Sequence, residues 1–273
     1  MESKNASLVF TALGHEGRLA VFRFLMRRAP VGARPTEIAE VLGLKQNTLS
    51  HYLADLEKVG LVTVRRDGRN LHYAPNTQTL GTLLSYLAVD CGRGRPDVLD
   101  RLPHDQDTQQ RPMNVLFICS GNSARSIFAE AILRDLGGNR FQAFSAGTKP
   151  GARLNPFALE VLKRNGHDTG GLRSKHLSEF QTGDAPYLDF VFTVCDTAAA
   201  EDCAPWSGTR ISGHWGLPDP VKAEGTDAEK ALAFATTYAA LYRRISAFVD
   251  LPLSQLGRAA LQTAVDAIAL PKS

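Results

Sequence analysis

The feature that most constrains this chain is an apolar run that ends abruptly at a cysteine and continues through a short polar loop. Residues 115–118 are all large and apolar, and Cys119 follows them directly. A loop of small or polar residues then leads to Arg125 and to an amphipathic segment over residues 127–136. The order predicts a buried strand, a tight loop and a helix.

The residues of this loop suit an anion site built around a nucleophile. Small residues let successive backbone amides face an anion at a helix N-terminus. The same positive field stabilises a thiolate, so we expect Cys119 to have a lowered pKa and to act as a nucleophile. Arg125 offers a planar fork for two oxygens of a tetrahedral anion. The predicted oxyanion-binding residues are Ser120, Gly121, Asn122, Ser123, Ala124, Arg125 and Ser126.

Length and composition bound the class of protein. A chain of 273 residues is typical of two domains, and 44% apolar with 22% charged residues is typical of a soluble globular chain. No apolar run is long enough to cross a membrane, and residues 1–5 lack the layout of a signal peptide. We therefore expect a cytoplasmic protein with no membrane partner, whose four cysteines are mainly reduced.

Residues 1–99 have the pattern of a winged helix-turn-helix domain, mainly α with a β-hairpin wing. Helical spacing over residues 5–28 precedes a short helix over 37–42, capped by Thr36 and ended by Gly43, and a second helix over 46–58. Two alternating runs around an Asp-Gly turn then predict a hairpin. Residues 1–100 hold 13 Lys and Arg against 10 Asp and Glu, which accounts for the whole net charge of +3. This sign suits a nucleic-acid partner.

A helix and a hairpin that are merely exposed to solvent would show the same spacing. A helix-turn-helix followed directly by a basic hairpin, however, favours DNA binding. The predicted DNA-binding residues are Gln46, Asn47, Thr48, Ser50, His51, Arg65, Arg66 and Arg69.

The N-terminal segment resembles the arsenical-resistance repressor family. The residues that carry the resemblance are 36–39, 49–53, 60–62, 66–69 and 73. It implies a homodimer that represses transcription at an operator DNA and is released by arsenite or metal ions. It also implies that the apolar stripe over residues 80–87 pairs across the dimer, although a plain core helix would show the same stripe. Many family members hold arsenite with three cysteines, whereas only Cys91 lies in the matching stretch here, as a candidate arsenite ligand or a relic.

Residues 100–112 are polar and aperiodic and predict a linker.

The segment 113–273 alternates strands and helices, which predicts an α/β domain with a parallel sheet. The expected strands are 114–118, 142–146 and 188–194, and the expected helices are 126–136, 155–165, 227–249 and 253–270. Cys119 and Cys195 each follow a strand, so both reach the edge where ligands bind. Asp219, between Pro218 and Pro220, is the candidate proton donor.

Residues 113–250 resemble the low-molecular-weight protein tyrosine phosphatase superfamily and, within it, the arsenate reductases. The residues that carry this resemblance are 115–126, 144–148, 190–196 and 214–220. It implies that Cys119 is the nucleophile, Arg125 the oxyanion clamp and Asp219 the general acid. By the same resemblance, Ser126 donates a hydrogen bond to the thiolate and Asn122 holds the loop's unusual backbone.

Two features favour reduction of arsenate over hydrolysis of phosphotyrosine. Val221 and Lys222 stand after the Asp-Pro pair, where the phosphatases usually carry aromatic residues. Cys195 and Cys203 can supply two electrons and bracket a short polar stretch, although two structural cysteines remain an alternative.

The sequence therefore predicts a repressor fused to an enzyme that reduces arsenate to arsenite through the Cys119 thiolate and a disulfide relay. No tightly bound cofactor is expected, and the external reductant is thioredoxin, or glutathione with glutaredoxin. Residual phosphatase activity is compatible with this site. Two alternatives stay open: a winged-helix regulator fused to a tyrosine phosphatase, and a non-catalytic regulator that senses an oxyanion or the redox state.

Overall fold

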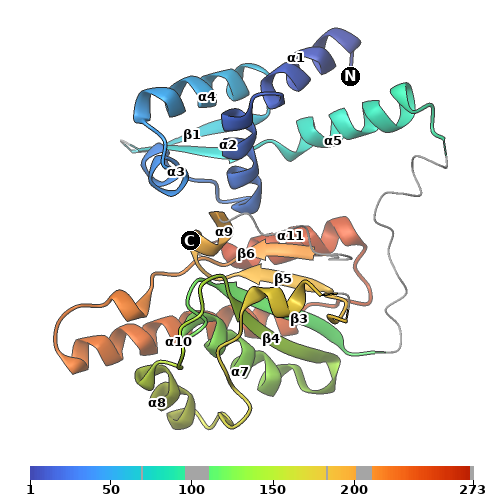
Figure 1. The fold of residues 1–273 in the computed structure, drawn as a ribbon. Helices are drawn as coiled ribbons and strands as arrows, with labels where there is room; N and C mark the ends of the chain where they lie inside the picture. The colour runs from blue at the N-terminus through green and yellow to red at the C-terminus, as the bar shows by residue number, and fades with distance from the viewer. Residues whose placement is uncertain (69, 96–110, 183, 201–210, 271–273) are drawn as a thin grey trace. The chain divides into compact units, whose positions relative to one another are not determined.

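A computed structural model describes residues 1–68, 70–95, 111–182, 184–200 and 211–270 of the chain (Figure 1). The chain divides into two compact units, Met1–Gln106 and Asp107–Ser273. Residues 100–110 of the predicted linker, together with Arg69 and Cys203, lie outside the described residues. The domain bounds 1–99, 100–112 and 113–273 therefore stay a prediction.

The first unit is a helix-turn-helix followed by a two-stranded hairpin, as the sequence predicts (Figure 1). Strands β1 and β2 are antiparallel, with Asp67 opposite Asn70 at the turn. The turn between α3 and α4 contains Gly43 at φ +63°, a left-handed conformation that glycine adopts without strain. The elements of this unit are α1 (Ser3–Leu13), α2 (Glu16–Arg27), α3 (Pro35–Leu42), α4 (Gln46–Lys58), β1 (Val62–Asp67), β2 (Asn70–Pro75), α5 (Thr77–Ser85) and the π-helix η1 (Tyr86–Cys91).

The structure divides the first helical segment of this unit in two and contradicts the predicted cap of the next helix. The helical spacing over residues 5–28 is split into α1 and α2, because the His15 ring caps α2 and the Arg18 guanidinium binds the last carbonyls of α1, including Ala12 O at 2.7 Å. Thr36 does not cap the next helix. Instead α3 begins at Pro35, and the Glu37 carboxylate accepts a hydrogen bond from the Arg34 amide at 3.0 Å.

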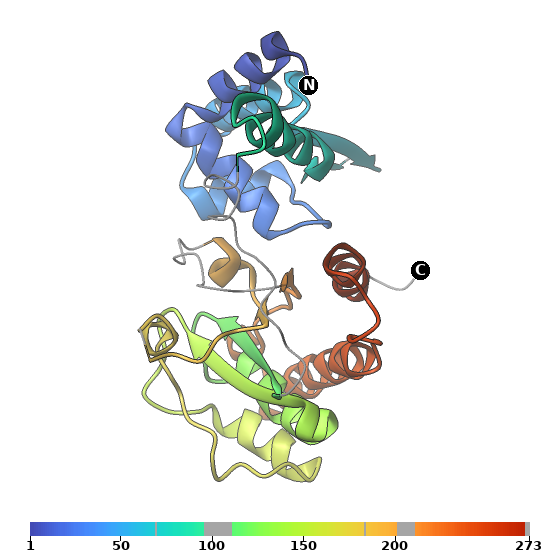
Figure 2. The ribbon, with the colours of Figure 1, turned by 90° about the vertical axis from the view of Figure 1, so that its right-hand side faces the viewer.

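The second unit is an α/β fold with a four-stranded parallel sheet in the order β4-β3-β5-β6, which confirms the predicted fold class. Helix α7 lies against β3 and β4, α10 packs on α7, and α11 packs on β6 (Figure 2). Strand β6 was not predicted from the sequence. The strands are β3 (Met113–Cys119), β4 (Phe141–Gly147), β5 (Phe190–Thr193) and β6 (Ile211–His214).

The helices of the second unit connect these strands and cover the sheet. They are α7 (Arg125–Gly137), η2 (Gly138–Arg140), α8 (Pro156–Arg164), η3 (Leu177–Phe180), α9 (Asp196–Ala200), η4 (Pro220–Lys222), α10 (Asp227–Val249) and α11 (Arg258–Ala269). The last predicted helix is therefore shorter than expected. In the described parts of the chain, no helix has the length and apolar character needed to cross a membrane.

The core of the second unit holds the end of β3 rigidly. Residues 115–118 of this strand are all at most 1% exposed, as expected for a central parallel strand covered on both faces. Phe192 stacks on Trp215 with 4.0 Å between ring centroids, and Phe248 packs edge-on against both. Burial of each such side chain stabilises the fold by roughly 1.5–3 kcal/mol. Cys119, at the carboxyl end of β3, is thus anchored by a densely packed core.

Candidate active site

The carbonyl groups of the loop between β3 and α7 accept hydrogen bonds from a neighbouring segment, which fixes the loop. The carbonyls of Cys119, Ser120, Gly121 and Ser123 accept hydrogen bonds from the amides of residues 148, 149, 151 and 155, at 2.9–3.1 Å. The N–H of a trans peptide points opposite to its C=O. The loop's own amides therefore point away from residues 148–155, and that of Asn122 donates to Cys119 Sγ, as an anion-binding loop requires. Of the seven predicted oxyanion-binding residues, 120–124 form this loop, and Arg125 and Ser126 begin α7.

Asn122 fixes the shape of this loop. It is fully buried and has a φ of +41°, which is uncommon for a residue other than glycine. Its backbone amide donates to Cys119 Sγ at 3.2 Å, and its side-chain Nδ2 donates to Ser126 Oγ at 2.8 Å. Gly147 backs the loop so closely that an added Cβ would lie 2.6 Å from Ser120 O and 2.9 Å from Asn122 Cβ.

The pKa of Cys119 departs from the prediction. Burial raises the pKa of this thiol above its ordinary value, and the charge of nearby Cys195 raises it further. Hydrogen bonds from Ser126 and the charge of Arg125 act in the opposite direction without reversing it. The expected lowering was wrong because the sequence shows the positive groups around the thiol but not its removal from water.

Arg125 and Asp219 meet over the loop. Arg125 is the first residue of α7 and is buried, and its Nη2 lies 2.7 Å from Asp219 Oδ2. Its Nη1 donates to Leu217 O at 3.0 Å. Asp219 precedes η4 and is half-buried, and its second oxygen accepts from the Val221 amide at 3.2 Å. The fold therefore brings the predicted clamp and the predicted acid together from positions far apart in the sequence.

Cys195 lies beside the same loop. It is a buried free thiol just before α9, and its Sγ lies 3.5 Å from Ser120 Oγ. The amide of Ala198 donates to this sulfur at 3.3 Å. Next to it, the buried ring of His214 bridges Thr193 Oγ1 and Asp196 Oδ1, which ties the ends of β5 and β6 to the start of α9. The position of Cys203 is not described.

Sequence reasoning missed several residues that support the site. Arg244, from α10, donates to Trp215 O at 2.7 Å and so holds the loop that carries Asp219. Glu130 and Lys175 form a buried ion pair at 2.9 Å behind the anion loop. Glu130 gave one usable signal, since it is a charged residue within the apolar first half of α7. Lys175 gave none.

The predicted DNA-binding residues lie on α4 and β1. Gln46, Asn47, Ser50 and His51 are exposed in the first turns of α4, and Thr48 is half-buried. Arg65 and Arg66 are exposed on β1. Figure 1 shows α4 and the hairpin as neighbouring parts of the first unit. Whether they contact DNA stays a prediction.

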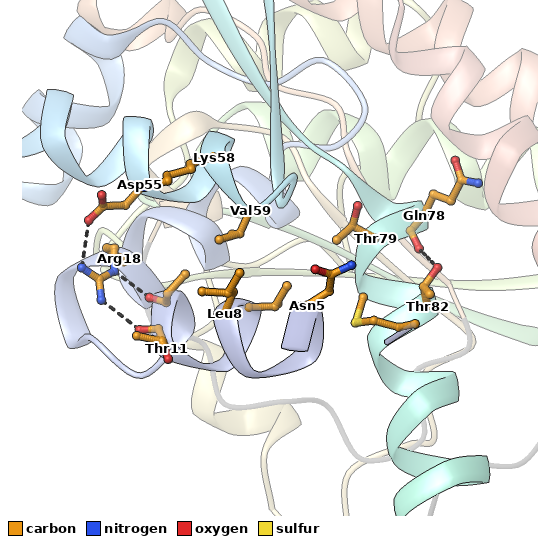
Figure 3. A pocket seen from close by; sticks show the side chains of 13 residues that line it. Asn5, Leu8, Thr11, Arg18, Asp55, Lys58, Val59, Gln78, Thr79 and Thr82 are labelled. Carbon is orange, nitrogen blue, oxygen red and sulfur yellow. Dashed lines mark hydrogen bonds and ion pairs between the residues drawn. The ribbon is translucent and has the colours of Figure 1, made fainter. Parts of the chain in front are cut away.

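Cys91 and a pocket complete the candidates in the first unit. Cys91 is an exposed free thiol at the end of η1. Among the described residues, no three His, Cys, Asp or Glu side chains come close enough to hold a metal ion, so the arsenite-ligand role of Cys91 stays a prediction. A cavity of about 670 Å³ lies between α1, α4 and α5 and is lined by Leu8, Val9 and Val59 (Figure 3). Its rim carries the Arg18–Asp55 ion pair at 3.0 Å, and its lining includes no cysteine.

Comparison with known families bears on both units. The family model described as low molecular weight phosphotyrosine protein phosphatase matches residues 114–262, which is more than half of the chain. The chain belongs to this family. A second model, described as a helix-turn-helix domain, matches residues 13–65. The two matches confirm the predicted fusion of a helix-turn-helix unit with a phosphatase-family unit.

Curated relatives of the phosphatase-family unit include arsenate reductases. That of Halalkalibacterium halodurans is 33% identical over 136 residues, which is 50% of this chain and 94% of that protein. That of Bacillus subtilis is 31% identical over 137 residues, with the same coverage of 50% and 94%. A solved structure of an arsenate reductase in the oxidized state has a TM-score of 0.42 and 25% identity, and covers 50% of this chain and 95% of that one.

Proposed function

We propose that the phosphatase-family unit is an arsenate reductase and that the helix-turn-helix unit is a DNA-binding repressor. One observation carries the first part. A second buried free thiol, Cys195, lies against the oxyanion loop that contains Cys119. A phosphatase needs one thiol, whereas reduction of arsenate needs two electrons and thus a pair. The similarity to arsenate reductases along 94% of their length supports this choice.

The proposed cycle begins with arsenate in the loop, held by the loop amides and by Arg125. Cys119 Sγ loses its proton and bonds to arsenic(V), and an arsenate oxygen leaves as water with a proton from the acid form of Asp219. Cys195 Sγ then attacks Cys119 Sγ. The electron pair of the sulfur–arsenic bond passes to arsenic, which departs as arsenite, and a disulfide joins the two cysteines.

We propose that Cys203 completes the relay. Its thiolate attacks Cys195, frees Cys119 and leaves a Cys195–Cys203 disulfide. An external dithiol such as thioredoxin, or glutathione with glutaredoxin, returns this disulfide to two thiols and is itself oxidised. No tightly bound cofactor takes part in this scheme. The cycle needs reduced cysteines at rest, which fits a reducing compartment such as the cytoplasm.

Hydrolysis of phosphotyrosine is the second candidate, because the matching family model describes such phosphatases. The segment after Asp219 speaks against it. Pro220 is followed by Val221 and Lys222, both exposed and neither able to stack on a phenyl ring. A small inorganic anion therefore suits the site better than an aryl phosphate.

The N-terminal unit is proposed to bind operator DNA as a homodimer. The exposed polar face of α4 supplies the base contacts, and Arg65 and Arg66 supply phosphate contacts from the wing. The α1 and α5 surfaces supply the dimer interface, since Leu8 and Leu84 are 52% and 55% exposed. Cys91 is the candidate arsenite ligand of the regulatory step, in combination with groups from the partner subunit.

Turnover assays test the enzymatic proposal. We expect arsenate-dependent consumption of reducing equivalents with thioredoxin or glutaredoxin, and little hydrolysis of an aryl phosphate. The variants Cys195→Ser and Cys203→Ser should both lose steady-state turnover. The exposed Cys91→Ser variant is the matched control and should keep it. If Cys203→Ser retains full turnover, the three-thiol relay is wrong, and if aryl phosphate is hydrolysed without any arsenate turnover, the reductase assignment is wrong.

A further inference from the structure

A lysine and a glutamate meet in the protein interior behind the anion loop. Lys175 Nζ lies 2.9 Å from Glu130 Oε2, and the two side chains are 8% and 4% exposed. Removing both charges from water has a cost that their mutual attraction offsets only in part, so a buried pair is a weak source of stability. A role in the site is the alternative that the surrounding contacts support.

A closed ring of hydrogen bonds joins this pair to the loop. Ser145 Oγ donates to Glu130 Oε2 at 2.5 Å, and Asn122 Nδ2 donates to Ser145 Oγ at 2.9 Å. The Lys175 amide donates to Asn122 Oδ1 at 2.6 Å, which closes the ring. Both side-chain ends of Asn122, the residue with positive φ, are therefore fixed by groups that belong to the ion pair or contact it.

The Glu130 carboxylate and the Lys175 amide together set the direction of the hydrogen bonds along this path. A carboxylate only accepts, so the Ser145 hydroxyl must point its proton at Glu130 and accept from Asn122. Asn122 then presents its NH2 group to Ser126 Oγ at 2.8 Å as well. Because Ser126 accepts there, its own proton is available for Cys119 Sγ, which lies 2.9 Å away. A hydrogen bond of this polarity favours the thiolate form of Cys119.

We propose that Lys175 and Glu130 act as a positioning pair for the nucleophile. Lys175 supplies a fixed internal cation beside the Glu130 carboxylate. Glu130 orients the Ser145 hydroxyl that accepts from Asn122, the Lys175 amide holds Asn122 Oδ1, and Asn122 so held lets Ser126 donate to Cys119. Neither residue touches the anion. The inference rests on Cys119 as the nucleophile of the proposed function, and it is the same whichever oxyanion the loop binds.

The double variant Lys175→Met/Glu130→Gln tests this pair without leaving a buried charge unpaired. A glutamine end group both donates and accepts, so it no longer dictates the direction of the Ser145 hydroxyl. We expect the double variant to fold with a thermal midpoint near that of wild type. The rate of Cys119 alkylation by iodoacetamide is measured by peptide mass across a pH series, without any oxyanion. Each rate is divided by the plateau rate of the same protein at high pH. Below the midpoint of the pH profile, we expect this relative rate to be about tenfold lower in the double variant than in wild type.

Arg134→Met is the matched control. Arg134 Nη2 also binds the Glu130 carboxylate, at 2.8 Å, but its side chain is 39% exposed and lies outside the ring. This variant should keep the wild-type pH profile. The proposal is overturned if the profile of the folded double variant superimposes on that of wild type. The alkylation experiment contains no arsenate, so its result does not depend on whether the protein reduces arsenate. An absence of arsenate turnover in the wild-type protein would contradict the proposed function but not this inference.

Discussion

Arg125 Nη2 and Asp219 Oδ2 lie 2.7 Å apart, so the proposed oxyanion clamp is paired with a carboxylate. The two residues come from the start of α7 and from the loop before η4. An entering oxyanion must share Arg125 with Asp219, and the two negative groups oppose each other. The Asp219 carboxylate therefore weakens binding of the anion, whereas the proposed reaction needs Asp219 as the proton donor.

Asp219→Asn should separate these two roles. Removal of the competing carboxylate should tighten binding of phosphate, used as an unreactive anion, by about 1 kcal/mol or roughly fivefold. Loss of the proton donor should lower arsenate turnover by about 10²–10⁴-fold. Calorimetric titration and the coupled turnover assay measure the two effects. Glu224→Gln removes an exposed carboxylate nearby and should change neither, while weaker phosphate binding by Asp219→Asn would contradict this view of the pair.

The raised pKa of the Cys119 thiol predicts a dependence of stability on pH. Because the folded-state pKa lies above the ordinary value of 9.0, this thiol contributes stability that is fully present below that pH and lost as the pH rises through the folded-state pKa. The free energy of unfolding of wild type minus that of Cys119→Ser should therefore decrease as the pH rises above 9.0. Urea unfolding of both proteins across this range provides the measurement. A difference that does not decrease above 9.0 would contradict the raised pKa, because a lowered pKa makes the difference grow only below 9.0.

Gly147→Ala should disturb the loop from behind. An added Cβ would lie 2.6 Å from Ser120 O and 2.9 Å from Asn122 Cβ, contacts that force backbone to move. We expect a loss of about 1–3 kcal/mol in the free energy of unfolding, together with reduced turnover. Gly151→Ala is the control, because the nearest atom to its Cβ would be Arg153 O at 3.8 Å. Equal stability of the two variants would mean that the loop tolerates this displacement.

Several parts of this site were predictable because their signals are local. The strand, the loop and Arg125 follow one another in the sequence, and their chemistry depends on that order. The Asp-Gly turn of the hairpin and Gly43 at the turn between α3 and α4 are local signals of the same kind. In each case the deciding interactions lie within a few residues of each other.

The remaining features depend on contacts between distant segments. Strand β6 contains a serine and a glycine and is a strand because β5 pairs with it. Lys175 and Glu130 are 45 residues apart, and only the fold brings them together. Burial of Cys119 is likewise a property of the folded unit. It reverses the expected direction of its pKa shift, since desolvation outweighs the nearby positive groups.

Arg65→Gln/Arg66→Gln should weaken DNA binding through phosphate contacts. Both side chains are exposed on β1, and each phosphate contact contributes about −0.9 to the slope of log affinity against log salt. The double variant should thus lower the magnitude of the slope by about 1.8 for duplex DNA. Fluorescence anisotropy over a salt series measures it. Lys58→Gln, at the opposite end of α4, should keep the wild-type slope, and an unchanged slope in the arginine variant would remove the wing from the interface.

The most direct test of the central claim is to map disulfides after a single turnover without external reductant. The reduced protein is mixed with arsenate, quenched and digested, and the cysteine-containing peptides are identified by mass. We predict release of arsenite in step with one disulfide per chain, joining Cys195 to Cys119 or to Cys203, and in Cys203→Ser a trapped Cys119–Cys195 disulfide. Phosphate in place of arsenate should give no disulfide. Release of arsenite without a disulfide to Cys195, or no arsenite at all from fully reduced protein, would contradict the account.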